Sequence, residues 1–141
     1  MGFTGSRKGM TRHQRIVIHK YLEELAAVQT EAEFHHGDAV GADAQAAGMA
    51  YTLRYRVICH PPKRSTYRAY TELNHVTLPV AEYLDRNRAI VDATSVLLAT
   101  PDGPERTRSG TWQAIRYARS LGDRYLLVVY PDGQVQRVTG R

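Results

Sequence analysis

Hydrophobic residues in this chain gather in short apolar runs and in helical stripes. Runs typical of strands occur at residues 1–4, 34–36, 57–59, 95–99 and 125–130. The run SVLLA at 95–99 is apolar at nearly every position, as parallel strands buried on both faces are. YLLVVY at 125–130 is the clearest strand signal in the chain. The pattern predicts five strands in the interior of one sheet.

Segments with helical character separate these runs. The first begins after Thr11, a residue type that caps helices, and extends to about residue 28, with a stripe formed by Ile18, Tyr21, Leu22, Leu25 and Ala26. The alanine-rich AQAAGMAYTL has high helix propensity, and residues 81–92 have helical character. A last helix follows Ser109 and ends near Leu121, where Gly122 is typical of a helix end.

The order of these elements predicts the fold class. Strands and helices alternate, and a turn at Pro131-Asp132-Gly133 leads into VQRVT (135–139), which we expect to form an antiparallel edge strand. Residues 63–79 show neither the period of a helix nor that of a strand, and this pattern predicts a long functional loop. We therefore expect a single Rossmann-like α/β domain over residues 1–141, with a mostly parallel, doubly wound sheet and a C-terminal antiparallel edge hairpin.

Composition indicates which class of partner the protein binds and in which cellular compartment we expect it. The net charge of +5 favours polyanionic partners, and arginine, which dominates the basic residues, suits bidentate phosphate recognition. The single cysteine, Cys59, excludes an intramolecular disulfide; its apolar neighbours predict a buried, inert thiol, and a reducing cytoplasm is the expected location. No apolar stretch reaches the roughly 20 residues that a membrane helix needs, so we expect no membrane partner.

Three glycine-rich turns follow predicted strands and are the candidate ligand-binding segments. Ligands of open parallel sheets bind beyond the carboxyl ends of the strands, and glycine lets backbone N–H groups approach a phosphate at a helix start. Neither the GxGxxG fingerprint nor the GxxxxGK[ST] loop is present, so no standard cofactor follows. The candidate binding residues of the turns are Gly5, Ser6 and Arg7; Gly37, Gly41 and Asp43; and Ser109, Gly110 and Thr111.

Four segments in this order, GFTGSR, HHGDAVGAD, DRNRAIV and SGTWQAI, resemble the SLOG superfamily of Rossmann-like proteins. This superfamily includes YspA/YpsA-related proteins, the DNA-uptake protein DprA and the Lonely-guy phosphoribohydrolases. The resemblance implies a nucleotide-related ligand, phosphate on the SGT turn, and Arg86 and Asn87 facing the same pocket. In the Lonely-guy enzymes an arginine on the related helix acts in cleavage of the base–ribose bond, and Arg86 matches it.

One departure from the family pattern bears on catalysis. The GTxxE-like segment of the enzymes carries a catalytic glutamate, and Ala114 stands at that place here. An alanine methyl can neither stabilise nor attack an oxocarbenium-like state. A carboxylate that could replace this glutamate is available at Asp38, Asp43 and Asp102, although capping or turn formation explains each of these residues more simply.

Other candidate sites give weaker signals. His35 and His36 are adjacent on a strand and point to opposite faces, so they do not share a metal ion with His60, and no metal site is predicted. The loop residues Lys63, Arg64, Tyr67, Arg68 and Tyr70 interleave cations with aromatics, a pattern that fits either a lid over a nucleotide or a single-stranded nucleic-acid surface, and we favour the lid.

Three hypotheses follow. The first is a binder or sensor of a nucleotide or nucleotide-derived phosphate ligand. The second is a nucleoside 5′-phosphate N-glycosidase that uses Arg86 as a catalytic residue. The third is a DprA-like single-stranded nucleic-acid binder. A homo-oligomer is compatible with all three.

Overall fold

The apolar runs pair into one seven-stranded sheet. The computed structural model describes residues 1–138, and its strand order is β4-β3-β2-β1-β5-β6-β7. The strands, in chain order, are β1 (Gly2–Gly5), β2 (Glu33–His36), β3 (Arg56–Cys59), β4 (Val76–Thr77), β5 (Val96–Thr100), β6 (Tyr125–Val129) and β7 (Val135–Val138). All neighbours are parallel except β6 and β7, which confirms the predicted fold class with its antiparallel edge pair. Thr139, the last residue of the predicted edge strand, lies outside the described residues.

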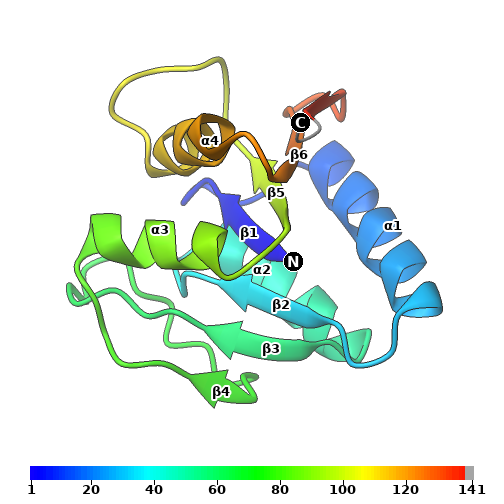
Figure 1. The fold of residues 1–141 in the computed structure, drawn as a ribbon, viewed down its shortest axis with the longest axis horizontal. Coiled ribbons are helices and arrows are strands. Elements are labelled where there is room, and N and C mark those ends of the chain that lie inside the picture. The colour runs from blue at the N-terminus through cyan, green and yellow to red at the C-terminus, as the bar shows by residue number, and fades with distance from the viewer. Residues whose placement is uncertain (139–141) are drawn as a thin grey trace.

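Two layers of helices cover the sheet and explain why the central strands are apolar throughout. The helices are α1 (Arg12–Val28), α2 (Ala42–Thr52), α3 (Tyr83–Asp92) and α4 (Gly110–Leu121), and Figure 1 shows α2 and α3 on opposite sides of the strands. On β5, Leu98 packs into the core beneath α1 and α2, whereas Leu97 and Ala99 pack beneath α3 and α4. Successive side chains of a strand point to opposite faces, so a strand that is covered on both faces, such as β5, is apolar at nearly every position.

The helix ends match the sequence signals. Thr11 caps α1: its hydroxyl accepts from the Gln14 amide at 3.1 Å, and the Gln14 side chain accepts from the Thr11 amide at 2.9 Å. Gly122 ends α4 in the left-handed conformation, with φ of 73°. The predicted cap and the predicted glycine stop are both confirmed.

The segment 63–79, predicted as a loop, contains the two-residue strand β4. Val76 and Thr77 pair in parallel with Ile58 and Cys59 of β3 and extend the sheet by one strand. Two residues are too few to show a period of two, so the sequence pattern could not reveal this strand. Among the described residues, no helix is long and apolar enough to cross a membrane.

Candidate ligand-binding cavity

A cavity of about 800 Å³ lies at the carboxyl edge of the sheet. The chain leaves β1 toward β2 on one side and returns to β5 on the other, so the strand order reverses between β1 and β5. The loops that follow these two strands, residues 6–8 and 102–109, both line the cavity. This is the position at which open parallel sheets bind ligands, and the volume lies within the usual range for small-molecule sites.

The start of α4 presents polar groups to the cavity. Gly110 and Thr111 line it, and within residues 1–138 their backbone N–H groups and the Thr111 hydroxyl have no hydrogen-bond partner. Thr111 is 6% exposed, so most of this residue is packed within the cavity wall. The Ser109 hydroxyl has a different task, because it accepts from the Trp112 amide at 3.2 Å and caps the helix. Only part of the predicted SGT turn is therefore free for a ligand.

Gly110 is required here by a close approach. A β-carbon at residue 110 would lie 1.6 Å from the Tyr83 hydroxyl, so the first turn of α3 contacts the start of α4 where a side chain would stand. Both residues line the cavity. A side chain at position 110 would displace Tyr83 and change the shape of the wall.

The turn after β1 is held by hydrogen bonds within the chain. The Ser6 amide donates to the Thr100 carbonyl at 3.1 Å, and the Ser6 hydroxyl accepts from the Lys8 amide at 3.1 Å. Gly5 allows β1 and β5 to pack closely, since a β-carbon there would lie 2.4 Å from Thr100 Oγ1. Arg7 is exposed, and its guanidinium carbon lies 3.9 Å from the Tyr67 ring centroid. Of this turn, the structure leaves Arg7 as the group with charge to offer a ligand.

The loop between β2 and α2 encloses a carboxylate of its own chain. Asp43 Oδ2 accepts from the amides of Gly37 at 3.1 Å and Ala39 at 3.4 Å, so these two N–H groups are occupied. Gly41 has a φ of 91°, and a β-carbon there would lie 2.3 Å from the Arg7 carbonyl oxygen. Desolvation raises the pKa of the buried Asp43, against the opposing effects of His36, Arg86 and the two amides. This loop therefore forms part of the cavity wall and contributes the Asp43 carboxylate to it.

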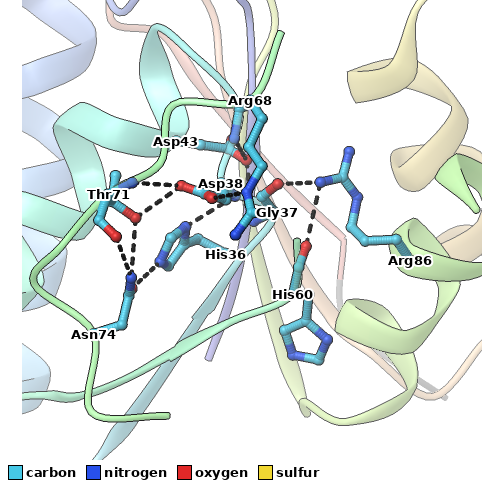
Figure 2. A network of polar contacts seen from close by, with 10 residues as sticks. His36, Gly37, Asp38, Asp43, His60, Arg68, Thr71, Asn74 and Arg86 are labelled. Carbon is cyan, nitrogen blue, oxygen red and sulfur yellow. Dashed lines mark hydrogen bonds and ion pairs between the residues drawn. The ribbon is translucent and has the colours of Figure 1, made fainter. Parts of the chain in front are cut away.

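Arg86 links the ends of two strands. Its guanidinium donates to the carbonyl of Gly37 after β2 and to the carbonyl of His60 after β3, the latter at 3.4 Å (Figure 2). Its Nε donates to Asn87 Oδ1 at 2.9 Å, and Arg86 is 4% exposed. Arg86 and Asn87 line the cavity, as the resemblance implied. Nη1 and Nε of Arg86 are engaged within the protein, whereas Nη2 has no partner within residues 1–138.

A second network attaches residues 63–79 to the end of β2 (Figure 2). Arg68 Nε lies 2.8 Å from Asp38 Oδ2, and the amide and hydroxyl of Thr71 donate to Asp38 Oδ1 at 3.0 and 2.8 Å. Desolvation raises the pKa of Asp38, but the hydrogen bonds from Thr71 and Arg68 outweigh it, and the pKa is lowered overall. These contacts attach the segment predicted as a lid to the end of β2, and its residues Arg64 and Tyr67 line the cavity.

His36, Asp38 and Cys59 are buried, and each offers one ligand-type atom within 4.8 Å of the others. His36 Nδ1 accepts from the Asp38 amide at 3.0 Å, and Nε2 contacts Asn74 Oδ1 at 2.7 Å, so both ring nitrogens are engaged. Burial, with repulsion from Asp38, raises the pKa of the Cys59 thiol to about 12. This donor set suits a hydrogen-bonded network around the Asp38–Arg68 ion pair better than a metal ion, which would require a thiolate and a free imidazole nitrogen.

His35 points to the opposite face from His36, as predicted. Its Nδ1 lies 2.8 Å from His60 Nε2, and its Nε2 lies 3.0 Å from Glu33 Oε1. A carboxylate only accepts, so the chain of bonds requires His35 to donate to Glu33 and His60 to donate to His35. Desolvation, reinforced by His35, His36 and Arg86, lowers the pKa of His60 to about 4. Both imidazoles are neutral at pH 7.

The cavity wall carries six basic and three acidic side chains. Asp102 is paired, with Arg106 at 2.6 Å and Lys8 at 3.6 Å, and Glu82 is paired with Lys63 at 3.3 Å. Within residues 1–138, Arg7, Arg64 and Arg108 have no ion pair, and all three are exposed at the cavity. The exposed unpaired side chains around the cavity are therefore positive, and Asp43 is the acidic residue of the wall that has no ion pair within residues 1–138. Arg108 and Tyr83 also line the cavity, and no sequence signal pointed to either because neither belongs to a glycine-rich turn.

The parallel sheet, the helices on both faces and the cavity at the strand-order reversal define a Rossmann-like α/β fold. Solved structures share this fold, so the resemblance seen in the sequence is confirmed at the level of the fold. No protein-family model matches the sequence, and no curated relative does.

Three of these structures are informative. The molybdenum cofactor binding protein from the phototrophic bacterium Rippkaea orientalis has a TM-score of 0.71 and 16% identity, over 92% of this chain and 74% of that one. The molybdenum cofactor carrier protein from Chlamydomonas reinhardtii has a TM-score of 0.65 and 14% identity, over 90% and 73%. DNA processing protein A from Helicobacter pylori, which binds single-stranded DNA, has a TM-score of 0.64 and 18% identity, over 90% and 63%.

Proposed function

We propose that this protein binds a nucleotide or nucleotide-derived phosphate ligand in the cavity, with a phosphate at the start of α4. One observation carries the proposal: the N–H groups of Gly110 and Thr111 and the Thr111 hydroxyl have no partner within residues 1–138, and both residues line an 800 Å³ cavity. Helix N-termini attract anions through such N–H groups and through the helix dipole. The Thr111 hydroxyl adds a neutral donor aimed at the same place.

The charge of the wall supports an anionic ligand. Arg7, Arg64 and Arg108 come from three different loops, and none is neutralised by a carboxylate within the described residues. Arginine donates in a planar fork that matches phosphate geometry. The molybdenum cofactor proteins of similar fold bind, by name, a cofactor, which is consistent with ligand binding by this architecture.

The two alternative hypotheses have less support. For the N-glycosidase, the Arg86 guanidinium is engaged with the carbonyls of Gly37 and His60, and Ala114 lines the cavity with a methyl group at the place of the glutamate. For the nucleic-acid surface, Arg7 covers one face of Tyr67 and Arg68 covers one face of Tyr70. These two tyrosines therefore offer less stacking surface than free rings would.

Isothermal titration calorimetry with the four ribonucleoside monophosphates, the matching nucleosides and inorganic phosphate tests the proposal. We expect at least one monophosphate to bind more tightly than its nucleoside. Thr111→Val should weaken that binding roughly tenfold or more, because a hydrogen bond to a charged acceptor contributes about 1.5–3 kcal/mol. Thr52→Val, at an exposed position at the end of α2, is the matched control and should bind like the wild type. Absence of monophosphate binding, or equal binding by Thr111→Val, would overturn the proposal.

A further inference from the structure

Asp43 presents one oxygen to the cavity that no group of the described chain satisfies. The residue lies in the first turn of α2, lines the cavity and is 5% exposed. Its Oδ2 accepts from the amides of Gly37 and Ala39, whereas Oδ1 has no donor within residues 1–138. Oδ1 is not sealed in the interior either, since the enclosed side-chain atom without a partner in this part of the chain is Thr100 Oγ1. Oδ1 therefore opens on the cavity.

Arg86 opposes the effect of desolvation on the Asp43 pKa but forms no ion pair with this carboxylate in the described structure. Its Nη1 donates to the carbonyls of Gly37 and His60, and its Nε donates to Asn87. A buried carboxylate without an ion pair needs hydrogen-bond donors, and it repels a phosphate. The end of the ligand that meets Asp43 must therefore be a neutral donor, while its anionic end lies at the start of α4.

We propose that Asp43 Oδ1 accepts a hydrogen bond from a sugar hydroxyl of the ligand and so selects ribonucleotides over their deoxy analogues. The inference rests on the proposed function and adds the sugar class and the direction of binding. A single acceptor oxygen favours a hydroxyl over guanine, whose two adjacent N–H donors pair with both oxygens of a carboxylate, and Oδ2 is already occupied by two amides. The same two amides hold the carboxylate in one position, and discrimination between ribonucleotides and deoxynucleotides requires an acceptor that is held in this way.

The test uses the monophosphate that binds best, with its 2′-deoxy and 3′-deoxy forms, by calorimetry on the wild type and on Asp43→Asn. Asparagine keeps an oxygen for the Gly37 and Ala39 amides but removes the charge. We expect at least one deoxy form to bind the wild type about tenfold more weakly, and Asp43→Asn to reduce this ratio to about twofold or less. Asp85→Asn is the control, because Asp85 also lies in the first turn of a helix but is exposed and outside the cavity wall.

The outcomes separate the two proposals. If both deoxy forms bind the wild type as tightly as the ribonucleotide, the role of Asp43 is overturned and the phosphate site at Thr111 stands. If Asp43→Asn changes the preference for the base and leaves the sugar preference intact, the hydroxyl assignment is also overturned. If the wild type binds no monophosphate, both proposals fail. The comparison of analogues on the wild type decides the matter even if the variant does not fold.

Discussion

Asp38 and Arg68 form an ion pair that joins the end of β2 to the basic segment of residues 63–79, with 2.8 Å between Asp38 Oδ2 and Arg68 Nε. The Asp38 side chain is 1% exposed and that of Arg68 is 20% exposed. The backbone reinforces the pair, since the Ala69 amide donates to the Asp38 carbonyl at 2.7 Å and the Val40 amide to the Tyr67 carbonyl at 2.9 Å. These contacts hold Arg64 and Tyr67, residues of the same segment, at the cavity.

The two arginines of this segment should therefore behave differently. Arg68→Ala leaves a buried carboxylate without its cation, and we expect the free energy of unfolding in urea to fall by about 3 kcal/mol. Arg64→Ala, at an exposed position, should change it by less than about 0.5 kcal/mol and should weaken nucleotide binding. Equal losses of stability in the two variants would show that the ion pair does not fix this wall.

Removal of the two hydroxyls of the SGT turn, Ser109 and Thr111, should have different effects on stability and on nucleotide affinity. Ser109→Ala removes a helix cap and should lower the free energy of unfolding by about 1 kcal/mol, with a small effect on the affinity for nucleotide. Thr111→Val should weaken nucleotide binding and change the free energy of unfolding little, since the Thr111 hydroxyl has no partner within the described residues. Thermal unfolding and calorimetry on both variants check this, and the idea fails if Ser109→Ala loses as much affinity as Thr111→Val.

The neutral state of His60 should appear in the pH dependence of stability. Its pKa is about 4 in the folded protein and near 6.5 when unfolded, so between these values the unfolded state binds a proton that the folded state does not. Stability should therefore fall as the pH decreases from 6.5 to 4, by an amount on the order of 3 kcal/mol from this residue. His60→Asn should give a shallower slope in urea unfolding measured across this range. An unchanged slope would assign the acid sensitivity to other groups.

Two glycines of neighbouring segments should respond in opposite directions to alanine. Gly41 has a φ of 91° and no room for a β-carbon, so Gly41→Ala should destabilise the protein by about 3 kcal/mol or more, or prevent folding. Gly48 lies inside α2, where a β-carbon would meet no atom within 4 Å, and Gly48→Ala should raise the free energy of unfolding by roughly 0.5–1 kcal/mol. Chemical denaturation of both variants makes the comparison, and similar effects at the two sites would refute it.

Local chemistry was sufficient to predict most of the fold and the edge of the sheet that holds the cavity. The cap at Thr11, the stop at Gly122 and the apolar runs of β5 and β6 act within a few residues or require burial on both faces, so their signals are present in the chain itself. The turns after β1, β2 and β5 were identified because parallel strands place their carboxyl ends at one edge.

The roles of individual residues were decided by tertiary contacts. Ser109 and Thr111 are both hydroxyls of one turn, yet one caps the helix and the other lines the cavity, according to where the start of α4 lies. Arg86 and Arg68 carry the same charge as Arg64 and Arg108, but they bind partners in the segments that follow β2 and β3, which the order of residues does not place beside them. The sequence by itself determined which elements form and which edge of the sheet is polar, because those depend on neighbours along the chain. Only the tertiary structure decided which of the polar groups are satisfied within the protein and which remain for a ligand, because hydrogen bonds and ion pairs depend on distances between segments that the chain order does not specify.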